Sequence, residues 1–198
     1  METIRTPRQK RSIATKEKIS RSGFELFCEK GYRRTNTIEI ARHAGVSVGA
    51  VYSYFNDKRD IFIDAFTRYL DVLSSSLFAE LAGRTFPTGL AAFIGEWISS
   101  YTRIYAKANY ALMQLRLMMM EDEDVNRHFC SLENQYVSGI AALLKENGFN
   151  ARDATEKVYI ACILVDTLNR EKNEFPHEEI GFETLRYKIE TIICSLLS

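Results

Sequence analysis

The chain is 198 residues long, 46% of them hydrophobic and 26% charged, and its 26 basic and 26 acidic side chains give a net charge of zero. This length allows a full hydrophobic core in one large domain or in two smaller ones. No run of about eighteen apolar residues could span a bilayer, and no apolar signal core follows Met1, so the sequence excludes a membrane-spanning protein and favours a soluble, cytoplasmic one.

The charges are divided unevenly along the chain. Residues 1–60 hold 13 basic and 7 acidic side chains, whereas residues 61–198 hold 13 basic and 19 acidic ones. A basic amino-terminal part followed by an acidic remainder indicates that the first part faces phosphate. A chance distribution of solvated surface charge is the alternative that the charge count alone leaves open.

Helical periodicity runs through most of the chain, and only three prolines interrupt it. No alternating strand pattern of useful length occurs, which predicts an all-α fold of about nine helices. The predicted order begins with a basic arm over 1–11. A group of short helices over 12–57, called the reader below, and a long helix over 58–81 follow it. Further helices are predicted, after a break at 83–89, over the segments 90–105, 112–120, 125–148, 152–169 and 178–197.

Residues 36–59 contain two short helical segments separated by Gly45, which is the layout of a helix-turn-helix DNA reader. Asn36 is expected to cap the first segment, and Glu39 three residues later is expected to close a capping box. Gly45 then ends this helix with a positive φ, and Ser47 caps the second helix. The second helix is expected to turn Ala50, Val51 and Phe55 inward and Val48, Gly49, Tyr52 and Ser53 outward.

The first third of the chain resembles the TetR family of bacterial transcriptional regulators. The resemblance covers roughly residues 12–65 and is carried by Phe24-Glu25-Leu26-Phe27-Cys28-Glu29-Lys30-Gly31-Tyr32, Thr35, Ile40-Ala41-Arg42-His43-Ala44-Gly45-Val46-Ser47, Val51-Tyr52-Ser53-Tyr54-Phe55 and Lys58. It implies an amino-terminal DNA-binding domain over 12–57 and a helical effector-binding and dimerisation domain over 58–198. It also implies a homodimer that binds a palindromic operator as a repressor and is released by a small, largely apolar effector.

The resemblance and the helix geometry together predict the residues that contact DNA. The first turn of the second helix enters the major groove, which places Ser47, Val48 and Gly49 nearest the base edges. Lys58 opens the long helix, where its ammonium and the free amides would bind a phosphate. The resemblance assigns Tyr52 to a phosphate, with packing on the helix surface as the alternative, and Tyr54 is either a contact or part of the core. The expected set is Arg33, Arg34, Asn36, Thr37, Ser47, Val48, Gly49, Tyr52, Tyr54 and Lys58.

Position 38 departs from the family pattern, because members often place a basic residue there and this chain has Ile38. One expected base contact is therefore in doubt. Compensating contacts to phosphate or the minor groove are expected from Arg33, Arg34, Arg5, Arg8, Lys10 and Arg11, with a purely solvated arm as the alternative. No Arg or Asn is available on the second helix for bidentate base reading, so specificity is expected to depend partly on DNA shape.

An unusually aromatic helical face lies in the middle of the chain, and the resemblance implies that it forms the effector pocket. A simple hydrophobic core is the alternative for each of its residues. The expected lining is Phe93, Trp97, Tyr101, Tyr105, Met113, Leu117, Met118, Phe129, Leu132 and Tyr136. Effector binding is expected to displace the long helix over 58–81 and to move the two readers out of register with the grooves.

One reader makes too few contacts for tight binding, so a symmetric dimer that spans two successive major grooves is expected. Two apolar stripes near the carboxyl end fit the four-helix dimer bundle that the resemblance implies. An intramolecular core is the alternative for either stripe. The expected interface residues are Val158, Ala161, Cys162, Val165, Leu168, Leu185, Ile189, Ile192, Ile193 and Leu196.

Motifs of enzymes and metal sites are absent from the sequence. Its four cysteines and three histidines are too widely scattered for metal or redox spacing, and the acidic run 121–124 is explained by the dipole of the helix that follows it. No glycine-rich phosphate loop or nucleophile elbow occurs. We therefore expect a DNA-binding regulator and not an enzyme, with no metal and no cofactor. An activator, or a regulator-fold protein that acts through a protein partner, is the alternative.

Overall fold

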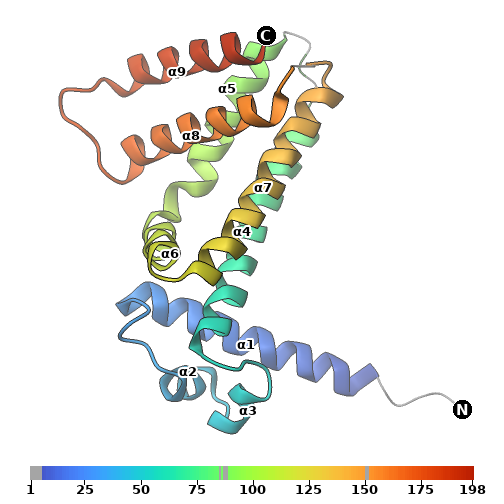
Figure 1. The fold of residues 1–198 in the computed structure, drawn as a ribbon, viewed down its shortest axis with the longest axis vertical. Helices are drawn as coiled ribbons and strands as arrows, with labels where there is room; N and C mark the ends of the chain where they lie inside the picture. Colours follow the sequence, from blue (N-terminus) through green and yellow to red (C-terminus); the bar gives the residue numbers. More distant parts are fainter. Residues whose placement is uncertain (1–5, 85, 87–88, 150–151) are drawn as a thin grey trace, which may run out of the picture. The chain divides into compact units, whose positions relative to one another are not determined.

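The computed structural model describes residues 6–84, 86, 89–149 and 152–198. These residues form helices, turns and connecting segments without a strand, which confirms the predicted all-α fold (Figure 1). The helices are α1 (Thr6–Lys30), α2 (Thr37–Ala44), α3 (Val48–Tyr52), α4 (Lys58–Ala82), α5 (Leu90–Ile104), α6 (Asn109–Glu121), α7 (Glu123–Glu146), α8 (Ala154–Asn173) and α9 (Phe182–Leu197), and a single 3-10 turn, η1 (Tyr105–Lys107), follows α5.

The amino-terminal segment differs from its prediction. Helix α1 begins at Thr6, so Arg8, Lys10 and Arg11 are helical and the segment they occupy is not a free arm. Arg5 lies outside the described residues. The last helix begins at Phe182, four residues later than predicted, because Gly181 precedes it with an extended backbone.

Two compact units divide the chain. The first consists of residues up to Leu70 together with Tyr110–Phe129, and the second consists of Asp71–Asn109 and Cys130–Ser198. The domain boundary expected at residue 58 stays a prediction. Helices α4 and α7 each belong to both units, and α6 belongs to the unit that contains α2 and α3.

Aromatic rings form the centre of the first unit. Phe62 of α4 stacks on Phe66 with ring centroids 4.2 Å apart, and it also meets Phe27 of α1 at 5.3 Å. Ile40 of α2 and Val51 of α3 are fully buried as well, so every helix of the reader contributes to this core. Burial of such side chains contributes roughly 1.5–3 kcal/mol each, which fixes α2 and α3 on α1 and α4.

Helices α5, α8 and α9 pack on one another in the second unit. This packing buries most of the expected interface residues in the core of the single chain. The fully or almost fully buried ones are Val158, Ala161, Val165, Leu168, Ile189 and Ile193. Cys162, Leu185 and Leu196 are half-buried, and Ile192 is exposed. The dimer interface itself stays a prediction.

A membrane span requires a helix that is both long and apolar. None of the helices in the described part of the chain combines the necessary length with sufficient apolar character. This finding agrees with the absence of long apolar runs from the sequence.

Candidate nucleic-acid interface

Helix α2 begins and ends at the residues that its sequence predicts. The Asn36 Oδ1 accepts a hydrogen bond from the Glu39 N–H at 2.9 Å, and Gly45 ends the helix with φ 62° and ψ 41°. Only glycine adopts this left-handed conformation without strain. The predicted capping box is only half formed, because the Glu39 carboxylate pairs with Lys30 of α1. That ion pair holds the start of α2 against the end of α1.

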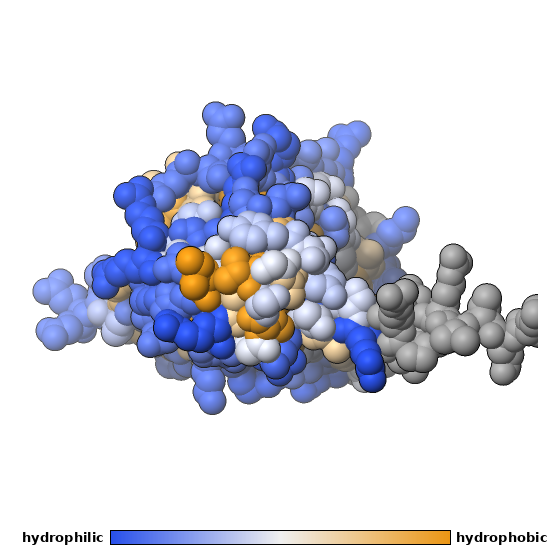
Figure 2. Space-filling model, turned by 90° about the horizontal axis from the view of Figure 1, so that it is seen from below, coloured by the Kyte–Doolittle hydropathy of each residue, from blue (hydrophilic) through white to orange (hydrophobic). Residues whose placement is uncertain are grey.

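Helix α3 presents a small, weakly polar surface. The Ser47 Oγ accepts a hydrogen bond from the Ala50 N–H at 3.1 Å and so caps the helix, as expected. Val51 is fully buried, while Gly49 and Ser53 are exposed. Val48 and Tyr54 are half-buried, so Val48 is less exposed than the sequence predicted. In Figure 2, which views the molecule from the side of α2 and α3, hydrophobic residues gather on a face that hydrophilic ones surround.

Two predicted DNA-contacting residues meet across the turn. The hydroxyl groups of Thr37 and Tyr52 lie 3.1 Å apart and share a hydrogen bond. Tyr52 is 53% exposed, so its hydroxyl remains accessible on the surface that carries α3. The shared hydrogen bond fixes the phenol ring at the position where a phosphate contact is expected.

Lys58 occupies a different environment from the one predicted. Its ammonium donates hydrogen bonds to the backbone oxygens of Tyr32 and Thr35, at 2.8 and 2.9 Å, and lies 4.0 Å from the centre of the Tyr32 ring. Partial burial lowers the pKa of this ammonium. Lys58 therefore fastens the segment between α1 and α2, and its contact with a phosphate stays a prediction.

Replacement of Lys58 by Met should reduce the free energy of unfolding by about 1–3 kcal/mol, because two carbonyl groups lose their donor. The affinity of the Lys58→Met variant for the operator should fall, while the slope of log affinity against log salt concentration stays unchanged. The matched control is Arg34→Met, since Arg34 is exposed and was predicted to contact phosphate. This variant should keep its stability and lose about 0.9 of salt slope for each phosphate contact. Urea unfolding measures the stability of both variants, and binding titrations at several salt concentrations measure the salt slope. A lower salt slope in Lys58→Met would show that Lys58 does contact a phosphate.

Acidic residues at the junction of α6 and α7 pair with two arginines, one that precedes α2 and one at the start of α4. The Arg33 guanidinium lies 2.8 Å from the Glu121 carboxylate, and Arg59 lies 3.1 Å from Asp124. Asp122 caps α7 by accepting the Val125 N–H at 3.1 Å, and this backbone hydrogen bond helps to lower the pKa of the Asp122 carboxyl group. The predicted role of the acidic run in starting a helix is therefore confirmed. Its partnership with Arg59 was missed, because no sequence pattern joins positions so far apart.

The predicted effector-lining residues are distributed over both units. Met113, Leu117, Met118 and Phe129 belong to the first unit, and Phe93, Trp97, Tyr101, Tyr105, Leu132 and Tyr136 belong to the second. Trp97 and Phe93 are fully buried, whereas Leu117 is exposed. The expected pocket stays a prediction.

Polar contacts in the second unit bring several of these aromatic residues together. The Trp97 indole N–H donates to the Tyr136 hydroxyl at 3.1 Å, and the Tyr101 hydroxyl donates to Asp166 at 3.3 Å. The rings of Tyr101 and Tyr105 are stacked with centroids 4.1 Å apart. Burial, followed by the charge of Asp166, raises the pKa of Tyr101 well above its usual value, so its hydroxyl remains a donor.

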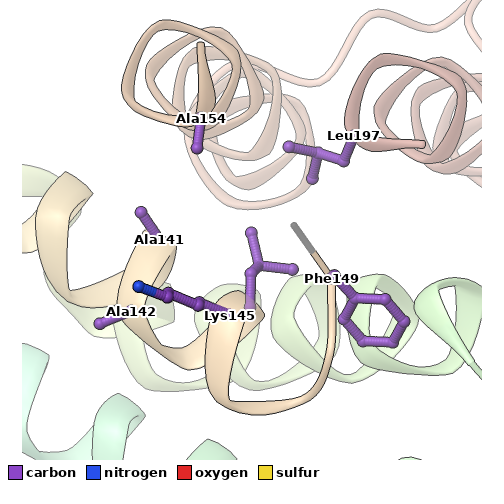
Figure 3. Close-up of a pocket in the computed structure, with 7 residues that line it drawn as sticks. Ala141, Ala142, Lys145, Phe149, Ala154 and Leu197 are labelled. Carbon is purple, nitrogen blue, oxygen red and sulfur yellow. The ribbon is translucent and has the colours of Figure 1, made fainter. Parts of the chain in front are cut away.

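A separate hollow lies in the second unit, near the ends of α7 and α9 (Figure 3). It is mostly apolar, with the Lys145 ammonium as its one charged group, and has a volume of about 360 Å³. Its lining residues are Ala141, Ala142, Leu144, Lys145, Phe149, Ala154 and Leu197. None of the ten predicted effector-lining residues is among them.

The capped helices, the left-handed glycine between them and the exposed face of α3 define a helix-turn-helix unit, the kind of element that DNA-binding proteins place in the major groove. Residues 19–65 match the model of the bacterial regulatory proteins of the TetR family. This match confirms, over these residues, the resemblance that the sequence suggested. The relatives that match are transcriptional regulators and not enzymes.

Among the curated relatives, the chain is 36% identical over 72 residues to the HTH-type transcriptional regulator HbdR of Aromatoleum sp., a match that covers 36% of this chain and 31% of the relative. It is 44% identical over 48 residues to the HTH-type transcriptional repressor BepR of Brucella suis, covering 24% and 23% of the two chains. The matched segments thus span a third or less of these two relatives.

The likeness of the whole chain is one of fold. A structure from Mesorhizobium loti, described as that of a TetR-family transcriptional regulator, superposes with a TM-score of 0.72 and covers 94% of this chain and 96% of its own. The two sequences are only 16% identical, so the superposition establishes a shared helical architecture and nothing about effectors.

Proposed function

We propose that the protein is a transcriptional repressor that binds a palindromic operator in the cytoplasm as a homodimer and is released by a small, largely apolar effector. The observation that carries the proposal is the surface formed by α2 and α3, where both helices are capped, Tyr52 is held by Thr37 and Gly49 is exposed. The name of BepR, a repressor that matches part of the reader, supports the repressor role.

Dimer formation is proposed for an exposed face of α8 and α9 that shares only Ile192 with the predicted set. On α8, Tyr159, Ile160 and Ile163 are exposed at helical spacing, and on α9, Tyr187 and Ile192 are exposed. These side chains lie outside the monomer core, so they are available to a second copy. An exposed apolar group of this size on consecutive helices is typical of protein interfaces.

Effector binding is proposed for the aromatic residues of the second unit. Trp97, Tyr101 and Tyr136 combine large apolar surfaces with hydroxyl and indole groups that orient a ligand. Helix α4 carries residues of both units, and we propose that it transmits the effect to the reader. An effector that prefers the released state by about 3 kcal/mol would weaken operator binding on the order of 100-fold.

The hydrogen bond between Trp97 and Tyr136 supplies a local test of this region. Tyr136→Phe should reduce the free energy of unfolding by about 1–3 kcal/mol, because the buried indole N–H loses its acceptor. Trp97 is the single tryptophan of the chain, so its emission should also shift to shorter wavelength. Urea unfolding and fluorescence spectra measure the two effects. The control Tyr110→Phe alters an exposed ring and should change neither. Wild-type emission in Tyr136→Phe would exclude the hydrogen bond in solution.

A genomic DNA selection with the purified protein tests the proposed function. Enrichment of a palindromic fragment, and weaker binding of that fragment by Tyr52→Phe, are the results expected of a regulator that contacts phosphate through Tyr52. Loss of binding on addition of a small apolar compound would identify an effector. If no fragment is enriched without an added protein, the repressor proposal fails and a partner protein becomes the better explanation.

A further inference from the structure

An isoleucine is exposed at the start of the reader. Ile38 is the second residue of α2 and is 67% exposed, although Ile40, two residues later, is completely buried. Its neighbour Thr37 shares a hydrogen bond with Tyr52 at the end of α3. That contact brings the first turn of α2, to which Ile38 belongs, close to the end of α3, which carries the exposed Tyr52.

Helix α3 offers no side chain of the usual base-reading kind. Helix α3 consists of Val48, Gly49, Ala50, Val51 and Tyr52. None of these side chains can form two hydrogen bonds to a single base, as Arg does with guanine and Asn does with adenine. Ser47 offers one hydroxyl, and that oxygen already accepts the Ala50 N–H. Discrimination among base pairs by α3 therefore depends on apolar contact or on DNA shape.

Thymine carries the one apolar group that base pairs present in the major groove, which is its 5-methyl group. We propose that Ile38 is a specificity-determining residue that reads this methyl group at one position of each operator half-site. The inference rests on the proposed function, since it assumes that the surface of α2 and α3 meets DNA. The branched side chain of Ile38 is stiff, so it can cover a methyl group with little loss of conformational freedom.

The proposal is tested by removing only the methyl group. Each thymine of the operator that the wild-type protein selects is replaced in turn by uracil, which keeps every hydrogen-bonding group. Uracil at one symmetric pair of positions should weaken binding of the wild-type protein. The loss should be about fourfold for each half-site, which is the value expected for one buried methyl-sized group. Ile38→Ala should bind the thymine operator more weakly and should not distinguish thymine from uracil at that pair.

Two variants identify the side chain responsible. Val72→Ala removes a branched side chain of similar exposure, 64%, from α4, and it should keep the wild-type preference for thymine. Val48→Ala tests the apolar residue at the start of α3. The proposal is overturned if no thymine is sensitive to uracil, if Ile38→Ala keeps the sensitivity or if Val48→Ala alone abolishes it. Failure to select any operator would instead refute the proposed function, and the inference with it.

Discussion

Ile163→Arg is expected to give a folded monomer that has lost tight operator binding. Ile163 is 48% exposed on α8 and lies one turn from Tyr159 and Ile160. In a two-fold symmetric interface the substitution occurs twice, so two guanidinium groups would be buried without partners and would repel each other. The monomer core should tolerate the change, because the core side of α8 is formed by other residues such as Val165.

Sedimentation and operator titration measure the two consequences separately. A monomer can occupy only one half-site at a time, so the affinity for the full palindrome should fall on the order of 100-fold or more. Val72→Arg places the same charge on an exposed position of α4 and should leave the dimer intact. Persistence of an Ile163→Arg dimer would show that copies associate through another surface.

The parts of the reader that the sequence predicted correctly are governed by local interactions. Asn36 caps α2 and Ser47 caps α3 through bonds to N–H groups three residues later, and the left-handed Gly45 depends on its own backbone. Such features can be recognised from a few neighbouring residues. The same reasoning explains why the acidic run that contains Asp122 was recognised as part of a helix start.

Features that depend on distant packing could not be predicted. Lys58 meets the carbonyl groups of Tyr32 and Thr35, which are 26 and 23 residues away, and a basic residue at a helix start equally suggests a phosphate. Helix α8 has an apolar side with Val165 and a second one with Ile163. Periodicity identifies both sides and does not reveal which of them the chain itself covers.

Gly49 provides a further prediction, because nothing within the protein requires a glycine there. Its φ is not positive, and a Cβ added to it would have the Ser47 Oγ, 4.0 Å away, as its nearest neighbour. Glycine in a helix is less favourable than alanine by roughly 0.5–1 kcal/mol. A residue that costs stability without an internal reason, on the exposed first turn of α3, is explained by close approach of an external molecule.

Gly49→Ala should therefore raise the free energy of unfolding by up to roughly 0.5–1 kcal/mol and weaken operator binding at least about tenfold, because each half-site would meet an added methyl group. Gly95→Ala is the matched control, since Gly95 lies within α5 and a Cβ there would also meet nothing closer than 4.0 Å. It should stabilise the protein similarly and leave operator binding unchanged. Urea unfolding measures the stability of both variants, and titration of one operator measures their affinities. Unchanged affinity in Gly49→Ala would show that α3 does not approach the bases at this residue.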